Sequence, residues 1–239
     1  MRIWEKILNC FLPPRCGKCG KILECDSGLC SNCIEDIEFI REPYCQKCGQ
    51  PFEFLELHGG KMLCGNCLKN TRSLFRMSRS AFAYNQSSKS LITDFKFHDK
   101  TENAKLLALI MWVAGKDIFE AGVDIIIPVP LHYARLIKRR YNQSALIGNE
   151  LSRLSKISID YTSLRRIKNT RPQVELSGHE RQSNVRNVFN VINNKNIVGK
   201  RVLLIDDVLT TGATLKECAK TLKKAGAKSV DTLTAGRVI

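Results

Sequence analysis

The chain has 239 residues, of which 44% are hydrophobic and 26% are charged, which excludes a disordered protein and favours one or two folded globular domains. Its 38 Lys and Arg against 23 Asp and Glu give a net charge of +15, which favours phosphate-bearing partners, either small molecules or nucleic acid; an ordinary basic surface is the alternative. The longest apolar run, residues 106–114, is too short to cross a bilayer, and Glu5 and Lys6 interrupt what would be the apolar part of a secretion signal, so we expect a cytoplasmic protein without membrane insertion.

Cysteine is concentrated near the N-terminus, where ten of the eleven cysteines fall within the first 67 residues. Without an export signal, metal binding is favoured over a disulfide framework. Eight of these cysteines form four C-x-x-C pairs, and two such pairs complete the tetrahedral shell of a structural zinc site. The sequence therefore predicts two zinc sites, one formed by Cys16, Cys19, Cys30 and Cys33 and the other by Cys45, Cys48, Cys64 and Cys67. An interleaved pairing, as in a cross-brace, remains open.

Residues 1–72 are expected to form a double zinc ribbon with a short amphipathic helix at its start. The module has too few large apolar residues to fold on its own core, so zinc binding is expected to stabilise it. Because thiolates fill every position of both shells, the zinc is expected to be structural rather than catalytic. Gly20 and Gly49 each follow a C-x-x-C pair directly, where a positive φ is commonly needed.

The middle of the chain carries one strand pattern and two basic runs. Residues 125–129 form an apolar run closed by prolines, which predicts a buried strand. The first basic run contains Arg135, Lys138 and Arg139, which share one face if the segment is helical. The second contains Arg165, Arg166, Lys168 and Arg171. Each run suits a pyrophosphate or a nucleic-acid backbone, and a solvated face is the alternative for each.

The segment 199–234 predicts a β-loop-α-β unit. Residues 202–205 are continuously apolar, as in a buried parallel strand, and the apolar residues from Leu215 to Leu222 recur at helical spacing. Cys218 lies on that apolar face and is expected to pack in the core. Gly226 is placed as the end of the helix, and a further strand begins near Val230.

Two adjacent carboxylates, Asp206 and Asp207, end the first strand of this unit, where burying them without a ligand would be costly. The loop that follows offers threonine hydroxyls, Gly212 for close backbone approach, and the N–H groups of a helix start, which together suit a phosphate. Acids beside a phosphate site fit a sugar phosphate or a bound magnesium. The alternative is an ordinary strand end followed by a capped helix. The motifs GxxxxGK(S/T) and GxGxxG are absent, which excludes a nucleotide P-loop and a Rossmann fingerprint.

The sequence IDDVLTTGAT resembles the phosphoribosyl pyrophosphate (PRPP) motif of type I phosphoribosyltransferases. Residues 128–143 resemble the PVPL…R…RGFNQ signature of the ComF (competence protein F) family, with Arg140 and Tyr141 where Gly-Phe is usual. Residues 170–189 resemble that family's T-x-x-Q…L-S…R-x-x-N segment, and residues 95–98 stand where its members have an F-K-Y element. The double zinc ribbon is also the family's N-terminal module, so the resemblance covers nearly the whole chain.

The resemblance implies a type I phosphoribosyltransferase-like α/β fold over residues 80–239, with a mainly parallel central sheet flanked by helices, a small hood at 80–118 and a core at 119–239. It also implies a PRPP site with magnesium. Asp206 and Asp207 would hold the ribose hydroxyls or the metal and are the candidate catalytic residues. Thr210, Thr211, Gly212, Ala213 and Thr214 would bind the 5′-phosphate, and Pro130, Leu131 and His132 would border the pyrophosphate. His132 either donates to the pyrophosphate or is satisfied within its loop.

The family's association with natural transformation implies a cytoplasmic accessory factor in DNA uptake that binds PRPP and single-stranded DNA. The candidate contacts to DNA or pyrophosphate are Arg135, Lys138, Arg139 and Arg171. The alternative is an enzyme that transfers a phosphoribosyl group from PRPP to a nitrogen acceptor. The net charge and the zinc ribbon favour the first, whereas the acid pair and the threonine loop serve both. The aromatic residues at 82–97 are expected to pack in the core rather than to stack on bases.

Overall fold

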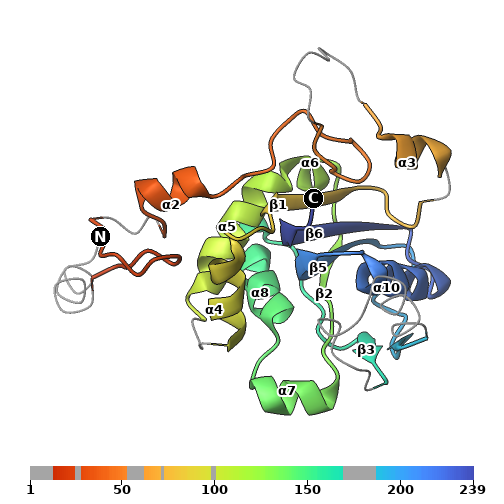
Figure 1. The fold of residues 1–239 in the computed structure, drawn as a ribbon. Coiled ribbons are helices and arrows are strands. Elements are labelled where there is room, and N and C mark those ends of the chain that lie inside the picture. The colour runs from red at the N-terminus through yellow and green to blue at the C-terminus, as the bar shows by residue number, and fades with distance from the viewer. Residues whose placement is uncertain (1–12, 25–27, 53–61, 71–72, 98–100, 169–186) are drawn as a thin grey trace.

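The computed structural model describes residues 13–24, 28–52, 62–70, 73–97, 101–168 and 187–239 (Figure 1). The expected N-terminal helix, Arg171 and most of the motif at 170–189 lie outside these residues. The side chain of Lys138 also lies outside the description, although its backbone is included. No helix in the described part of the chain is both long enough and apolar enough to span a bilayer.

The centre of the molecule is a four-stranded parallel sheet in the order β1-β6-β5-β2. Its strands are β1 (Ser78–Ala83), β6 (Ser229–Arg237), β5 (Arg201–Leu209) and β2 (Ile125–Pro128). The apolar stretch of β5 is completely buried, because β5 has a strand on each side and helices over both faces. The prediction of an α/β fold with a mainly parallel sheet is therefore confirmed.

Helices cover the two faces of this sheet (Figure 1). One face carries α4 (Lys89–Phe97), α5 (Asn103–Ala114), α6 (Lys116–Glu120) and α8 (Gln143–Ser155), and the other carries α10 (Ala213–Lys224). Alternate residues of β5 separate the two cores, since Leu203 and Ile205 pack with the first set of helices and Leu204 packs with α10. The predicted aromatic packing is confirmed for Phe82 and Phe95, which are fully buried in the first core.

Within the segment 80–118 that is predicted to form the hood, β1 and the described parts of α4, α5 and α6 pack with the central sheet. Strand β1 pairs in parallel with β6 along its length, and every one of its residues is buried. Helix α5 packs against β1, β6 and α8. The segment joins the core because its backbone completes the sheet edge and its apolar side chains fill one sheet face. A separate antiparallel pair, β3 (Leu164–Arg166) and β4 (Phe189–Val191), lies beside α10.

The second cysteine group, which consists of Cys45, Cys48, Cys64 and Cys67, is docked on the start of β1. The Ser78 N–H donates to the Lys47 carbonyl at 2.9 Å. The Arg79 side chain, which is 2% exposed, donates to the Gln46 carbonyl at 2.9 Å and to the Asp117 carboxylate of α6 at 2.6 Å. Because Arg79 is buried and bonds to both parts, it joins the ribbon to the α/β domain.

The first cysteine group, which consists of Cys16, Cys19, Cys30 and Cys33, is docked on α5. The chain between the two groups covers the outer edge of β1. The Asn103 side chain donates to the Gly17 carbonyl at 3.2 Å. Residues 38–40 run antiparallel to β1, where the Ile40 N–H donates to the Ala81 carbonyl at 2.9 Å and the Ala83 N–H donates to the Glu38 carbonyl at 2.8 Å. The ribbon module therefore protects an edge that would otherwise expose unpaired backbone groups.

The predicted positive φ of the two knuckle glycines is confirmed, at +75° for Gly20 and +68° for Gly49. Gly49 is the crowded one of the two: a Cβ there would lie 2.5 Å from the Ser78 carbonyl oxygen, whereas a Cβ on Gly20 meets nothing within 4 Å. We expect Gly20→Ala to cost about 1 kcal/mol from backbone strain alone, and Gly49→Ala to cost more because a backbone atom must also move.

The measurement is zinc release to a chromogenic chelator over a urea series, with Gly20→Ala as the control for strain. Equal midpoints for the two variants would contradict the docking of the second ribbon through Gly49.

Candidate metal centres and phosphate-binding site

Two groups of four cysteines come together in the structure, and each is contiguous in sequence. Cys16, Cys19, Cys30 and Cys33 form one group and Cys45, Cys48, Cys64 and Cys67 the other, with the sulfur atoms of each group within 4.8 Å of one another. The structure therefore brings these residues together in the predicted pairing and not in the interleaved one. Four converging thiolates match a closed structural zinc site.

Short helices supply the last ligand of each group. Helix α2 (Ser31–Asp36) begins after Cys30 and carries Cys33, and α3 (Gly65–Lys69) begins after Cys64 and carries Cys67. The Cys30 N–H donates to the Cys16 sulfur at 3.4 Å, and the Cys64 N–H donates to the Cys45 sulfur at 3.3 Å. The Cys16 and Cys45 sulfurs therefore each accept a hydrogen bond from the backbone of their own ribbon.

The thiols of each group differ in how readily they ionise. Burial opposes ionisation of Cys16 and Cys45, but backbone N–H groups outweigh it and lower the pKa of each thiol to about 6. Burial, reinforced by the neighbouring sulfurs, raises the pKa of Cys33 and Cys67. A full set of four thiolates therefore needs a cation nearby, and Zn²⁺ would offset half of its negative charge.

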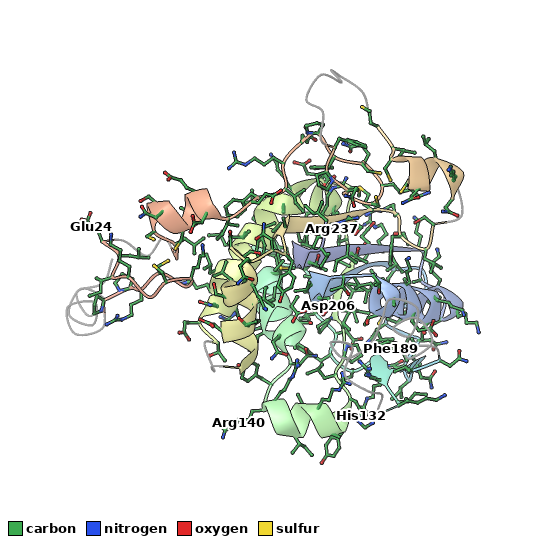
Figure 2. The ribbon with its side chains drawn as sticks, in the orientation of Figure 1. Glu24, His132, Arg140, Phe189, Asp206 and Arg237 are labelled. Carbon is green, nitrogen blue, oxygen red and sulfur yellow. The ribbon has the colours of Figure 1, made fainter. Side chains whose placement is uncertain are left out.

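Asp206 and Asp207 share a pocket with the threonine turn. Both acids lie near the end of β5, and the pocket of about 140 Å³ beside them is also lined by Thr210, Gly212, Ala213 and Thr214. Asp207 is buried and Asp206 is half-buried, and Figure 2 shows Asp206 near the centre of the molecule. Thr211 does not line this pocket; it lines a larger groove on the other side of the turn.

The Asp206 carboxylate is oriented by two donors. The Ser144 hydroxyl donates to Asp206 Oδ1 at 2.9 Å, and the Asp207 N–H donates to the same oxygen at 3.0 Å. Ser144 lies in the first turn of α8, where the Asn142 side chain accepts from the Ser144 N–H at 3.1 Å and donates to the Val129 carbonyl at 3.0 Å. Ser144 was not predicted, although it directly follows the Asn142-Gln143 pair of the family signature.

Gln143 lies beside Ser144 and is 2% exposed, and its side-chain nitrogen has no hydrogen-bond partner among the atoms described. A buried amide donor of this kind is costly unless a ligand or water satisfies it.

The turn between β5 and α10 carries the threonines and the glycine that the sequence predicts to bind a phosphate. Gly212 has φ +71° and precedes the first residue of α10, so the chain reverses at a position that favours glycine. The Ala213 N–H donates to the Thr211 hydroxyl at 3.4 Å, and Thr210 and Thr211 are exposed. The turn therefore presents hydroxyl and N–H groups at the start of a helix of 12 residues.

The loop at residues 130–132 leaves the sheet next to the acid pair. Pro128 pairs with Ile205 across the sheet, and the Val129 N–H donates to the Ile205 carbonyl at 2.9 Å. His132 caps α7 (Tyr133–Arg139), with its Nδ1 accepting from the Ala134 N–H at 3.2 Å. Pro130, Leu131 and His132 do not line the pocket of the acid pair, and local bonding satisfies one nitrogen of His132.

The first basic run is helical, because Arg135 and Arg139 lie on α7. Arg140 follows α7 with φ +66°, which is the left-handed conformation that favours glycine. Arg140 therefore has the backbone conformation that the glycine of the family signature would readily adopt. Tyr141 donates its hydroxyl to the Phe95 carbonyl at 2.9 Å.

The second basic run divides into buried and exposed members. Arg165 and Lys168 are exposed, as a solvated face requires, but Arg166 is buried with its guanidinium 5.6 Å from the Phe189 ring centre. Burial, reinforced by repulsion from Arg135, lowers the pKa of Arg166 to about 10, while Asp206 opposes the shift. Two like charges thus lie within electrostatic reach of each other near the acid pair, an arrangement that an anionic ligand would stabilise.

Comparison with known proteins gives two family matches. Residues 7–69 match the double zinc ribbon domain and residues 125–236 match the phosphoribosyl transferase domain. The chain is 35% identical to competence protein F of Haemophilus influenzae, over 92% of this chain and 95% of the relative. It is 30% identical to the DNA utilization protein YhgH of Salmonella typhimurium, over 85% and 87%, and 28% identical to competence protein ComFC of Bacillus subtilis, over 89% and 85%.

The two cysteine groups predict independent losses of metal. We expect the purified chain to hold two zinc ions, and Cys16→Ser or Cys45→Ser to hold one, because each removes a ligand from a separate group. Cys218→Ser is the matched control, since Cys218 is fully buried on α10 and belongs to neither group. Zinc content by atomic absorption is the measurement, and loss of both ions from either single variant would contradict two independent sites.

Proposed function

Since the chain belongs to the competence protein F family, we propose that it binds PRPP with magnesium and acts as a cytoplasmic accessory factor in DNA uptake that also binds single-stranded DNA. The observation that carries the first part is that Asp206, Asp207 and residues of the turn at 210–214 line the same pocket. The names of the relatives, which refer to competence and to DNA utilization, support the second part.

In this proposal each wall of the pocket binds one part of the ligand. The turn at 210–214 binds the 5′-phosphate through hydroxyl and backbone N–H groups. Asp206 and Asp207 accept hydrogen bonds from the ribose hydroxyls, and their oxygens are the donor type that magnesium prefers. Bound magnesium would supply positive charge to the pyrophosphate. Ser144 keeps the Asp206 carboxylate in a fixed orientation for this work.

The pyrophosphate is proposed to lie toward Arg135 and Arg166. These two guanidinium groups repel each other, and Asp206 attracts Arg166. A polyanion between them would remove the repulsion and offset the cost of burying Arg166. His132, with its Nδ1 already accepting a hydrogen bond, has only Nε2 available to donate to such a group when neutral.

The acid pair gives the direct test of this proposal. We expect Asp206→Asn with Asp207→Asn to weaken PRPP binding about a hundredfold in the presence of magnesium, because hydrogen bonds to charged groups contribute roughly 1.5–3 kcal/mol each. Isothermal titration calorimetry is the measurement. The control is Asp36→Asn, a ribbon-surface acid paired with Lys18. Unchanged PRPP affinity in the double variant would overturn the proposed site.

Enzymatic transfer is tested on the same samples. Pyrophosphate release from PRPP on addition of a base or amine, lost in the double variant, would assign the chain a phosphoribosyltransferase activity. PRPP binding without release across an acceptor panel would leave the binding role alone.

The proposed binding of single-stranded DNA has an electrostatic signature. With a net charge of +15, affinity for a labelled oligothymidylate should fall linearly on logarithmic scales of affinity and salt concentration, with a slope of about −0.7 for each phosphate neutralised. Fluorescence anisotropy over a salt series measures it. Affinity that is independent of salt would contradict a contact with the nucleic-acid backbone.

A further inference from the structure

A groove of about 800 Å³ separates the second zinc ribbon from the turn at 210–214. One wall comes from the second cysteine group and helix α3, and the other comes from the turn at 210–212, Lys216 of α10 and Arg237 at the end of β6. Figure 1 shows α3 and α10 on the same side of the molecule. The groove is within the size range of small-molecule sites, and it is several times larger than the acid pocket.

The ribbon wall of the groove is fixed to the α/β domain. The Arg237 guanidinium donates to the Cys48 carbonyl and, at 2.6 Å, to the Gln50 side-chain oxygen. Gly49, between them, lies against the Ser78 carbonyl. Hydrogen bonds between the ribbon and the α/β domain therefore hold the two walls of the groove together.

The Lys and Arg side chains along the groove come from both of its walls and face the second zinc group, whose four thiolates and one Zn²⁺ sum to a formal charge of −2 and whose Cys48, Cys64 and Cys67 also line the groove. Lys69 in the last turn of α3 and Lys216 in the first turn of α10 are both exposed and both line it, and Arg237 lines it as well. Among the described residues that line the groove, none is acidic. An anion entering here meets cations contributed by both the ribbon and the α/β domain.

The groove also has an apolar surface, which a simple anion would not use. Leu74, which is 38% exposed, lines it together with Phe75 and Leu209. Apolar surface flanked by lysines suits a ligand that has a flat ring and a phosphate, and a single-stranded nucleotide has both because its base is not paired.

We propose that this groove binds a nucleotide of single-stranded DNA, with its base against the Leu74 and Phe75 side and its phosphates toward Lys69 and Lys216. This inference rests on the proposed function and gives its DNA-binding part a location. The groove and the acid pocket share Leu209, Thr210 and Gly212, so the DNA strand and PRPP lie on the two sides of one turn.

The test uses the zinc-loaded full chain with Lys69→Ser and Lys216→Ser combined. The charge-matched control combines Lys220→Ser and Lys228→Ser, which remove the same charge from exposed positions that do not line the groove. Anisotropy with a labelled oligothymidylate and calorimetry with PRPP and magnesium are measured on every sample, after zinc content and thermal midpoint have been matched to the wild type.

We expect the groove variant to bind the oligonucleotide about tenfold more weakly, with a salt slope reduced by about 1.4, since each lysine neutralises one phosphate. PRPP affinity should stay unchanged in it, and the control should retain the wild-type slope.

Three results would overturn the assignment of the groove. In the first, the groove variant and the control lose equal affinity for DNA, which would place the effect in net charge alone. In the second, the groove variant loses affinity for both PRPP and DNA, which would mean that the groove and the acid pocket form one site. In the third, wild-type protein binds PRPP but no oligonucleotide, which would leave the groove to an anion of another class, such as an acidic peptide. Failure of wild-type protein to bind PRPP, with DNA binding intact, would instead count against the proposed PRPP site and leave the groove standing.

Discussion

The placement of β5 between β2 and β6 determines where charged side chains can lie on this strand. A strand with neighbours on both sides and helices over both faces has no room for charge along its length, and its buried stretch is accordingly apolar. Charge is tolerated only where the strand ends. Asp206 and Asp207 stand at that point, and hydrogen bonds from Ser144 and from the backbone of Asp207 hold one oxygen of Asp206 in place. The turn that follows carries hydroxyl and N–H groups, so acidic side chains and hydrogen-bond donors lie together at the end of the strand.

The zinc ribbons are a structural extension of the sheet rather than an appended module. Residues 38–40 pair with the outer edge of β1, and the buried Arg79 bonds to the ribbon and to Asp117 together. Arg237, which ends β6, bonds to the ribbon at Cys48 and Gln50. The free energy of zinc binding is therefore expected to stabilise the strands β1 and β6 as well as the cysteine groups. Metal loss at the second group would relax one wall of the groove described above.

The elements that could be predicted from sequence are those whose signal is local. Four C-x-x-C pairs, an apolar run before an acid pair, and helical spacing after a glycine turn each follow from nearby residues, and the structure has them where expected. The pairing of β1 with β6 could not be predicted, because it joins segments from distant parts of the chain and no local pattern encodes it. The burial of Arg166 was hidden for the same reason, since it depends on the pairing of β3 with β4. Ser144 was missed because a serine in a helix start is ordinarily a cap.

If PRPP and a DNA strand bind as proposed, they share one turn, and their affinities become linked. Leu209, Thr210 and Gly212 form part of both the acid pocket and the groove, and Gly212 holds its left-handed conformation only while the turn keeps its shape. A phosphate that orders this turn from one side lowers the cost of ordering it from the other. Any such coupling is reciprocal, so PRPP would strengthen the binding of a strand in the groove by the same factor as the strand strengthens the binding of PRPP. A sugar phosphate would then act as an affinity control on DNA without any chemical turnover, and the same acid pair would serve that role as well as a transfer reaction.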